Sequence, residues 1–194
     1  MKAITHVTKE VSIAEIVEAI RSGKHVESYQ VGDVLEIGGI RHAIIGIDAE
    51  EGLTHSMTVQ RINKVYDRIF NDSYRATYEE SEIRKYLNGD YANDLPAEFV
   101  EAVKPIKVDG MDGEERFFLL SSGELDPETT KYPYYQTKEN RTKYDEDGYG
   151  IWWWLRDPYT GDSYYPRYCG TDGGIYSYYG AGNACGVAPA CVIA

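Results

Sequence analysis

The 194-residue sequence predicts an α+β domain with short antiparallel strands and two or three helices. Two observations predict this class. Apolar residues recur at helical spacing in a few short segments, and apolar runs of strand length lie between glycine-rich turns elsewhere. The composition agrees, because 42% hydrophobic and 27% charged residues are typical of a globular protein. The length suits one large domain, or one domain with a small appendage.

The first helix signal lies near the N-terminus. Ser12 and Glu15 have the spacing of a capping box. Isoleucine and valine then recur at helical spacing, and Gly23 can end the helix in the left-handed conformation. We therefore expect residues 1–30 to form a helical appendage to the main domain, 31–194. The helix packs on that domain or mediates contact with a partner or a second copy, and the intramolecular arrangement is preferred.

Two further helices are predicted in the middle of the chain. Thr77 and Glu80 repeat the capping-box spacing at the start of a helix over 77–88, whose apolar residues fall on one face. A short helix is predicted over 97–103, since Pro105 disfavours helical geometry in the residue before it.

Strands are predicted where apolar runs meet turn signals. Gly38 and Gly39 interrupt the apolar segment 33–48 and predict a hairpin with a tight turn. The segment 53–62 alternates loosely, and 116–121 is a continuous apolar run typical of a buried strand. In the last fifth of the chain, strands are predicted over 152–156, 164–169, 175–179 and 187–193.

The net charge of -12 and the pI near 4.8 restrict the class of partner. An acidic protein repels phosphate backbones and anionic membrane surfaces, so nucleic acid is not an expected partner. No segment has the roughly 20 consecutive apolar residues that span a bilayer, so membrane insertion is not expected. The first ten residues lack the apolar stretch of a signal peptide, so the general secretory route is not expected either.

The cysteines and histidines form no metal-binding pattern in the sequence. Cys169, Cys185 and Cys191 make an odd number, which argues against a disulfide framework, and no C-x-x-C pair occurs. The histidines are scattered through the other end of the chain, at His6, His25, His42 and His55. We therefore expect no zinc site, no other metal and no cofactor.

The segment 151–194 has the composition of a recognition surface. It is rich in Tyr, Gly, Ser, Asp and Asn, and it contains no Lys and no Glu. Tyrosine offers a large amphipathic contact area at little cost in conformational entropy. A single tyrosine on a strand is more often structural, but so many phenols cannot all enter one core with their hydroxyls satisfied. The candidate ligand-binding residues are Tyr159, Asp162, Tyr164, Tyr165, Arg167, Tyr168, Asp172, Tyr176, Tyr178, Tyr179 and Asn183.

The residues around these candidates are assigned other roles. The apolar residues expected to hold the candidates in place are Trp152, Trp153, Trp154, Leu155, Val187, Pro189 and Val192. The segment 126–150 is polar and aperiodic, which predicts a long surface loop. Its Tyr132, Tyr134 and Tyr135 either extend the aromatic surface or anchor the loop.

Four motifs occur in order along the chain. They are SEIRKYLNG (81–89), FFLLS (117–121), WWLRDP (153–158) and GVAPA (186–190). Together they resemble an uncharacterised domain family of bacteria and their phages, over roughly residues 31–194. Two positions depart from the family pattern: Asp157 stands where the family usually has Ser, and Ala188 stands where it usually has Arg.

The motif order is also similar to proteins with a C-type-lectin-like fold, in particular the variable proteins of diversity-generating retroelements. The resemblance implies a rigid α+β scaffold whose C-terminal region, here 152–194, is diversified to bind a ligand. It implies a protein or glycan target on a cell surface. It also implies a location on a phage virion or a bacterial surface, or in the cytoplasm if neither applies. Catalysis is not expected.

Two alternatives remain open. Formylglycine-generating enzymes share this architecture and oxidise a substrate cysteine with paired cysteines, a role for which Cys185 and Cys191 are the candidates. The second alternative is a structural virion subunit, with its aromatic residues buried against its own copy or a neighbouring virion protein. The calcium-binding motifs of true C-type lectins do not occur in the sequence.

Overall fold

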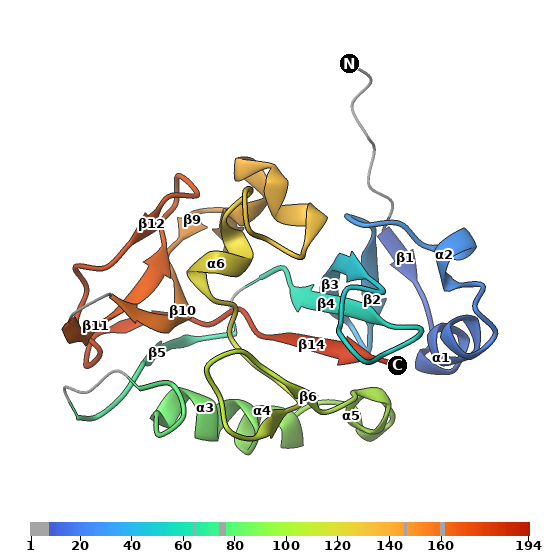
Figure 1. The fold of residues 1–194 in the computed structure, drawn as a ribbon, viewed down its shortest axis with the longest axis horizontal. Helices are drawn as coiled ribbons and strands as arrows, with labels where there is room; N and C mark the ends of the chain where they lie inside the picture. Colours follow the sequence, from blue (N-terminus) through green and yellow to red (C-terminus); the bar gives the residue numbers. More distant parts are fainter. Residues whose placement is uncertain (1–7, 64, 74–76, 146, 160–161) are drawn as a thin grey trace.

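The computed structural model of the protein describes residues 8–63, 65–73, 77–145, 147–159 and 162–194. The side chains of residues 162 and 163 lie outside this description. Two main sheets are flanked by helices (Figure 1), so the predicted α+β class is confirmed.

The first sheet has the strand order β1-β2-β3-β4-β14. The bounds of these strands are Thr8–Glu10, Val34–Ile37, Ile40–Ile47, Met57–Arg61 and Ala190–Ile193. β1 runs parallel to β2, and the other neighbours are antiparallel. Gly38 and Gly39 join β2 to β3 with φ angles of 57° and 77°, which glycine adopts without strain. The predicted hairpin is confirmed.

The second sheet has the strand order β12-β11-β10-β13-β5. The bounds of these strands are Ile175–Tyr176, Asp162–Cys169, Trp153–Tyr159, Ala184–Gly186 and Asp67–Ile69. β10 pairs parallel with β13, and the other neighbours are antiparallel. Two small ribbons complete the strands: β6 (Ile106–Lys107) with β7 (Glu114–Glu115), and β8 (Lys143–Tyr144) with β9 (Gly150–Ile151).

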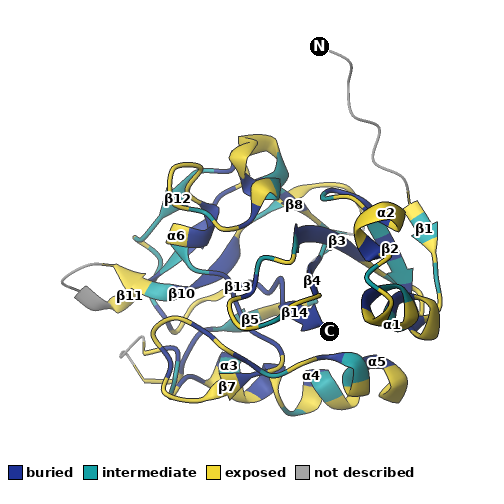
Figure 2. Ribbon diagram, turned by 45° about the vertical axis from the view of Figure 1, so that its right-hand side comes forward, coloured by how far each residue is buried: buried dark blue, intermediate teal, exposed yellow. Residues whose placement is uncertain are grey.

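Two extended segments join the sheets side by side. The chain leaves the first sheet after β4 to enter the second at β5, and it returns between β13 and β14. The Val65 amide donates to the Val187 carbonyl and the Arg61 amide to the Pro189 carbonyl, each at 2.9 Å. The apolar side chains of both sheets form one hydrophobic cluster. Figure 2 shows β3 and β14 among its buried strands.

The helices lie outside the sheets. α1 (Ile13–Arg21) and α2 (His25–Ser28) lie beside the first sheet, and α3, α4 and α5 follow one another along one side of the molecule (Figure 1). The bounds of the remaining helices are Glu82–Leu87 (α3), Asp90–Asn93 (α4), Ala97–Ala102 (α5), Ser122–Leu125 (α6) and the 3-10 helices Pro133–Gln136 (η1) and Lys138–Arg141 (η2). None of the described helices combines the length and the apolar character that crossing a membrane requires.

The N-terminal segment packs on the rest of the chain. α1 begins with the predicted capping box between Ser12 and Glu15, and its Ile13, Ile16 and Ile20 are buried in the common core. β1 adds a strand to the first sheet through its pairing with β2. The helix therefore makes the intramolecular contacts that the sequence favoured.

The helix predicted over 77–88 begins later than its spacing indicated. Its N-cap is Ser81, whose hydroxyl accepts a hydrogen bond from the Arg84 amide at 3.2 Å, so the cap assigned to Thr77 is wrong. The Ser81 hydroxyl also donates to the Tyr78 carbonyl at 2.7 Å. This second bond ties the cap to the turn that precedes it. The helix predicted over 97–103 is confirmed as α5.

One predicted strand and one predicted loop differ in the structure. Residues 117–120 are buried as predicted, but they form no strand, and only an isolated bridge joins Phe118 to Ala190. The segment 126–150 holds η1, η2 and β8, so it is not the one long surface loop that was predicted. Its Tyr132 and Tyr135 are fully buried and act as anchors. The local sequence is polar, but these two rings hold it against the first sheet.

Candidate functional site

Six aromatic side chains of the second sheet form a layered cluster, which we call the aromatic face: Trp152, Trp154, Tyr168, Tyr176, Tyr178 and Tyr179. Trp154 lies opposite Tyr168 in the β10–β11 register, and both are fully buried. Above them, Trp152 is 41% exposed and Tyr178 is 68% exposed. Tyr176 and Tyr179 are half-buried at the edge of the core. The cluster thus has a buried floor and an open upper surface.

Ring-to-ring contacts fix the upper surface on its floor. Trp152 stacks on Tyr168 with centroids 5.3 Å apart, and Tyr178 meets Tyr168 edge-on at 5.7 Å. Tyr179 meets Trp152 edge-on at 5.5 Å, and Tyr176 lies 5.7 Å from Tyr178. Such pairs contribute about 0.5–1.5 kcal/mol each beyond the burial of their area. The exposed rings are therefore held in place before any ligand arrives.

Tyr168 was predicted to be an exposed binding residue, and the structure corrects this placement. Trp152 and Tyr178 cover its ring, so its exposed fraction is 0%. Its hydroxyl has no hydrogen-bond partner within the described residues. Burial, and next the adjacent Tyr178, raise the pKa of Tyr168 above that of an ordinary phenol. The residue supports the face from below.

Backbone and indole hydrogen bonds support the same cluster. The segment that follows β12 folds back along β11, where the Ala181 amide donates to the Tyr164 carbonyl at 3.2 Å. The Ala181 carbonyl in turn accepts from the Phe70 amide at 2.8 Å. The Trp154 indole donates to the Arg68 carbonyl at 2.8 Å, and on the other face of β10 the Trp153 indole donates to the Arg141 carbonyl at 2.9 Å. The two tryptophans thereby satisfy their polar atoms while buried.

A second group of predicted residues lies along the β10–β11 hairpin. Tyr159, Tyr164 and Tyr165 are all exposed there. The β10–β11 pairing is irregular here, since its register shifts between Pro158 and Tyr159. The side chain of Asp162 lies outside the described residues.

Arg167 is engaged by the protein itself. Its Nε lies 3.2 Å from Asp157 Oδ2, and its guanidinium lies over the Tyr159 ring at 5.7 Å. Asp157 also accepts hydrogen bonds from the amide and the hydroxyl of Ser122, at 2.6 and 2.5 Å. Through Asp157, Arg167 links β11 to α6. Its role in setting specificity stays a prediction.

Asp172 orients one ring of the aromatic face. Its carboxylate accepts from the Gly174 amide and from the Tyr176 hydroxyl, each at 2.9 Å. The Gly174 amide, followed by Tyr176, lowers the pKa of Asp172. The carboxylate is exposed, and the Lys138 ammonium lies 3.8 Å away. Asn183 is also exposed, in the turn before β13.

Trp152 belongs to the aromatic face, although the sequence predicted a supporting role for it. Its exposure and its stacking on Tyr168 place it in the upper surface. Strand alternation could have indicated this, because Trp152 and Trp154 point to the same side of the chain while Trp153 points to the other. A run of three tryptophans gives no sign in its composition of which ring stays open.

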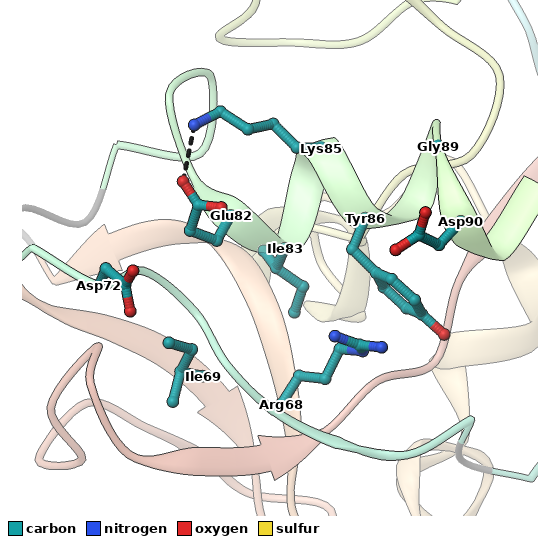
Figure 3. A pocket seen from close by; sticks show the side chains of 9 residues that line it. All are labelled: Arg68, Ile69, Asp72, Glu82, Ile83, Lys85, Tyr86, Gly89 and Asp90. Atoms are coloured by element: carbon teal, nitrogen blue, oxygen red, sulfur yellow. Dashed lines mark hydrogen bonds and ion pairs between the residues drawn. The ribbon is translucent and has the colours of Figure 1, made fainter.

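A hollow of about 420 Å³ lies beside the face, between β5 and the helices α3 and α4 (Figure 3). The Arg68 guanidinium stacks over the Tyr86 ring at 3.4 Å, and Lys85 pairs with Glu82 at 2.7 Å. The residues that line it are Arg68, Ile69, Asp72, Glu82, Ile83, Lys85, Tyr86, Gly89 and Asp90. Two cations and three carboxylates oppose one another in this lining. The hollow therefore offers no single charge to a ligand.

Most of the chain matches one protein family. Residues 53–194 match the family described as Domain of unknown function (DUF6273). The chain belongs to this family. No curated protein and no solved structure matches the chain. The aromatic face lies entirely inside the DUF6273 region, whereas β1 to β3 and the first two helices precede it.

The arginine of the WWLRDP motif has a structural role in this DUF6273 protein. Arg156 is buried, and its Nη1 lies 2.5 Å from Glu124 Oε2 and 3.0 Å from the Leu119 carbonyl. The adjacent Asp157 makes the contacts to Ser122 and Arg167 described above. Ala188 is the other departure from the family pattern. It is buried, and its carbonyl accepts from the side-chain amide of Gln60 at 2.9 Å.

The cysteines of the DUF6273 region lie apart in the fold. Cys185 is on β13 of the second sheet and Cys191 is on β14 of the first, and both are buried. Burial raises the pKa of the Cys191 thiol and raises that of Cys169 to about 12. A reactive cysteine has a depressed pKa and partial exposure. These observations do not favour the oxidase alternative.

Proposed function

We propose that this DUF6273 protein is a binding protein whose aromatic face recognises a protein or a glycan on a cell surface. The observation that carries the proposal is the exposure of Trp152 and Tyr178 on top of the buried Tyr168. Large apolar rings open to solvent in a monomer mark interaction sites when they are contiguous. Here Trp152 and Tyr178 both pack on Tyr168, which joins them into one ring cluster.

The chemistry of the rings suits either class of target. Tryptophan and tyrosine are the residues most enriched at the energetic centres of protein interfaces. Their flat surfaces also match the apolar face of a sugar ring, and the phenol hydroxyls can bond to sugar hydroxyls. Because neighbouring rings already restrict their rotamers, binding loses less side-chain entropy than it would with free side chains.

We further propose that the face is the variable surface of a C-type-lectin-like protein, diversified over 152–194 by a retroelement. The supporting feature is the arrangement of the segment: its exposed aromatic residues lie between Trp152 and Tyr178, and the buried strand β14 follows them. On this proposal the protein is carried on a phage virion or a bacterial surface, as a homo-oligomer or next to another virion protein. A near-copy of the coding segment that differs only at adenines, beside a reverse-transcriptase gene, would test this finer proposal.

The binding proposal is tested with a glycan array and a phage-displayed peptide library. The purified chain, its Tyr178→Ala variant and its Tyr66→Ala variant are compared on the same probes. Tyr66 is the matched control, because it is 67% exposed and takes no part in the ring contacts described for the face. We expect probes that the unaltered chain and Tyr66→Ala retain equally, with at least a tenfold loss for Tyr178→Ala.

Two outcomes would overturn the proposal. One is that no glycan or peptide is retained by the unaltered chain. The other is that the retained probes bind Tyr178→Ala as tightly as they bind the unaltered chain. If light scattering shows a stable oligomer that Tyr178→Ala dissociates, the face is instead an interface between copies or with a virion neighbour.

A further inference from the structure

The fold brings together two histidines and an aspartate that lie far apart in the sequence. His25 lies at the start of α2, Asp48 directly follows β3, and His55 lies in the turn before β4. Their ligand atoms all lie within 4.8 Å of one another. In Figure 1, α2 and the strands of the aromatic face are at opposite ends of the long axis.

We propose that His25, Asp48 and His55 form a binding site for a divalent transition-metal ion of the zinc class. Imidazole nitrogens and a carboxylate oxygen are donors that zinc accepts in proteins. A tetrahedral zinc ion with bonds of about 2.0–2.2 Å holds its ligand atoms about 3.3–3.6 Å apart. The cluster is compact enough to adopt this spacing, since His25 Nε2 lies 2.9 Å from Asp48 Oδ1 and all ligand atoms lie within 4.8 Å of one another.

The most buried ligand is fixed, and the most exposed one is adjustable. His25 is fully buried, while Asp48 and His55 are exposed. The Asp48 carboxylate also accepts from the Ser56 amide at 2.8 Å, which holds its position. The His55 ring meets the His25 ring edge-on at 5.1 Å, and the residue is exposed. A small rotation of this exposed ring brings its nitrogen to coordination distance.

A simple histidine–aspartate pair explains the cluster less completely. The pair joins His25 Nε2 to Asp48 Oδ1 and gives no reason for a second imidazole beside the first. A metal ion would use both imidazoles and the carboxylate, and it would leave its fourth position open to solvent. The net charge of -12 favours cations near the protein.

The site lies mostly outside the DUF6273 region, because only His55 falls within residues 53–194. It belongs to the part of the chain that supplies β1 to β3. The histidines are 30 positions apart and follow no zinc spacing, which is why the sequence predicted no metal site. The contact depends on the long β3 strand returning Asp48 to α2.

Isothermal titration with zinc chloride, on chain first dialysed against a chelator, tests the proposal. The variants are Asp48→Asn and His55→Asn, and Glu51→Gln is the control because it removes an exposed carboxylate from the same turn outside the cluster. We expect one zinc ion per chain for the unaltered protein and for Glu51→Gln, with at least a tenfold loss of affinity in each ligand variant. At a zinc concentration about a hundredfold above Kd, the melting temperature should rise by about 5–10 °C.

Both ligand variants are expected to keep the fold of the unaltered chain. Asn at position 48 can still accept from the Ser56 amide, and the exposed His55 contributes little burial. A melting curve without zinc that matches the unaltered chain verifies this for both. The proposal is overturned if the unaltered chain binds no zinc, or if both variants bind zinc as tightly as Glu51→Gln does. The latter result would place the ion elsewhere.

Discussion

Two segments of the chain share the spacing Tyr-x-Tyr-Tyr, and the fold treats them in opposite ways. In residues 132–135, Tyr132 and Tyr135 are fully buried. In residues 176–179, Tyr178 is exposed and its two neighbours are half-buried. The first segment is flanked by polar sequence and the second by glycine-rich sequence. The residue pattern alone therefore does not determine whether these rings are buried.

The difference comes from hydrogen-bond acceptors supplied by distant parts of the chain. The Tyr132 hydroxyl donates to Glu50 at 2.9 Å, and the Tyr135 hydroxyl donates to Gln60. Glu50 also accepts from the Thr58 hydroxyl at 2.6 Å and pairs with Lys131 at 2.7 Å. Burying a phenol whose hydroxyl is unpaired costs free energy. In the aromatic face, the Tyr176 hydroxyl bonds to the exposed Asp172, and the Tyr168 hydroxyl has no partner in the described residues.

The largest expected effect contrasts one ring from each segment. Tyr132→Ala removes a fully buried ring and leaves Glu50 without one of its donors. We expect a loss of about 3–5 kcal/mol in the free energy of unfolding, as for other buried aromatic truncations. Tyr178→Ala removes a 68% exposed ring with two ring contacts and should lose about 1–2 kcal/mol. Urea unfolding followed by circular dichroism measures both values.

An equal destabilisation by the two variants would contradict the comparison. Tyr178 would then be a structural ring whose exposure has no bearing on recognition. Tyr66→Ala provides the baseline for an exposed tyrosine outside both segments.

An intermediate effect is expected from removing a single buried hydroxyl. Tyr135→Phe keeps the ring but leaves Oε1 of the buried Gln60 side chain without its donor. An acceptor left unsatisfied in the interior costs about 1–3 kcal/mol. The free energy of unfolding should fall by that amount, with no change in the denaturant slope. If Tyr135→Phe leaves the free energy of unfolding unchanged, the hydroxyl does not account for the burial of this segment.

Local signals in the sequence predicted the elements that depend on local chemistry. The capping box at Ser12, the glycine turn at Gly38 and the short helix before Pro105 all lie where the sequence placed them. In each case the partners are a few residues apart, so spacing contains the information. The cap at Thr77 failed because Ser81 offers a competing cap that also bonds to the preceding turn.

Contacts between distant segments could not be read from the sequence. The Tyr132 and Tyr135 acceptors lie 82 and 75 residues away, and His25 meets Asp48 only after β3 has formed. The exposure of Trp152 likewise depends on the path of the segment after β12, which leaves that ring uncovered. The composition of 151–194 indicated a recognition surface, but it did not indicate which tyrosine would be its floor.

The smallest expected effect tests that floor. The Tyr168 hydroxyl is buried without a partner in the described residues, so its removal in Tyr168→Phe leaves no other group unsatisfied. We expect the free energy of unfolding to stay within about 0.5 kcal/mol of the unaltered chain, or to rise, in contrast to Tyr135→Phe. The same urea titration measures it. A loss of about 1 kcal/mol or more, as expected for a broken hydrogen bond, would show that the Tyr168 hydroxyl is hydrogen-bonded, with the Tyr178 hydroxyl as the nearby partner. Tyr178 would then be held by a hydrogen bond as well as by its edge-on packing.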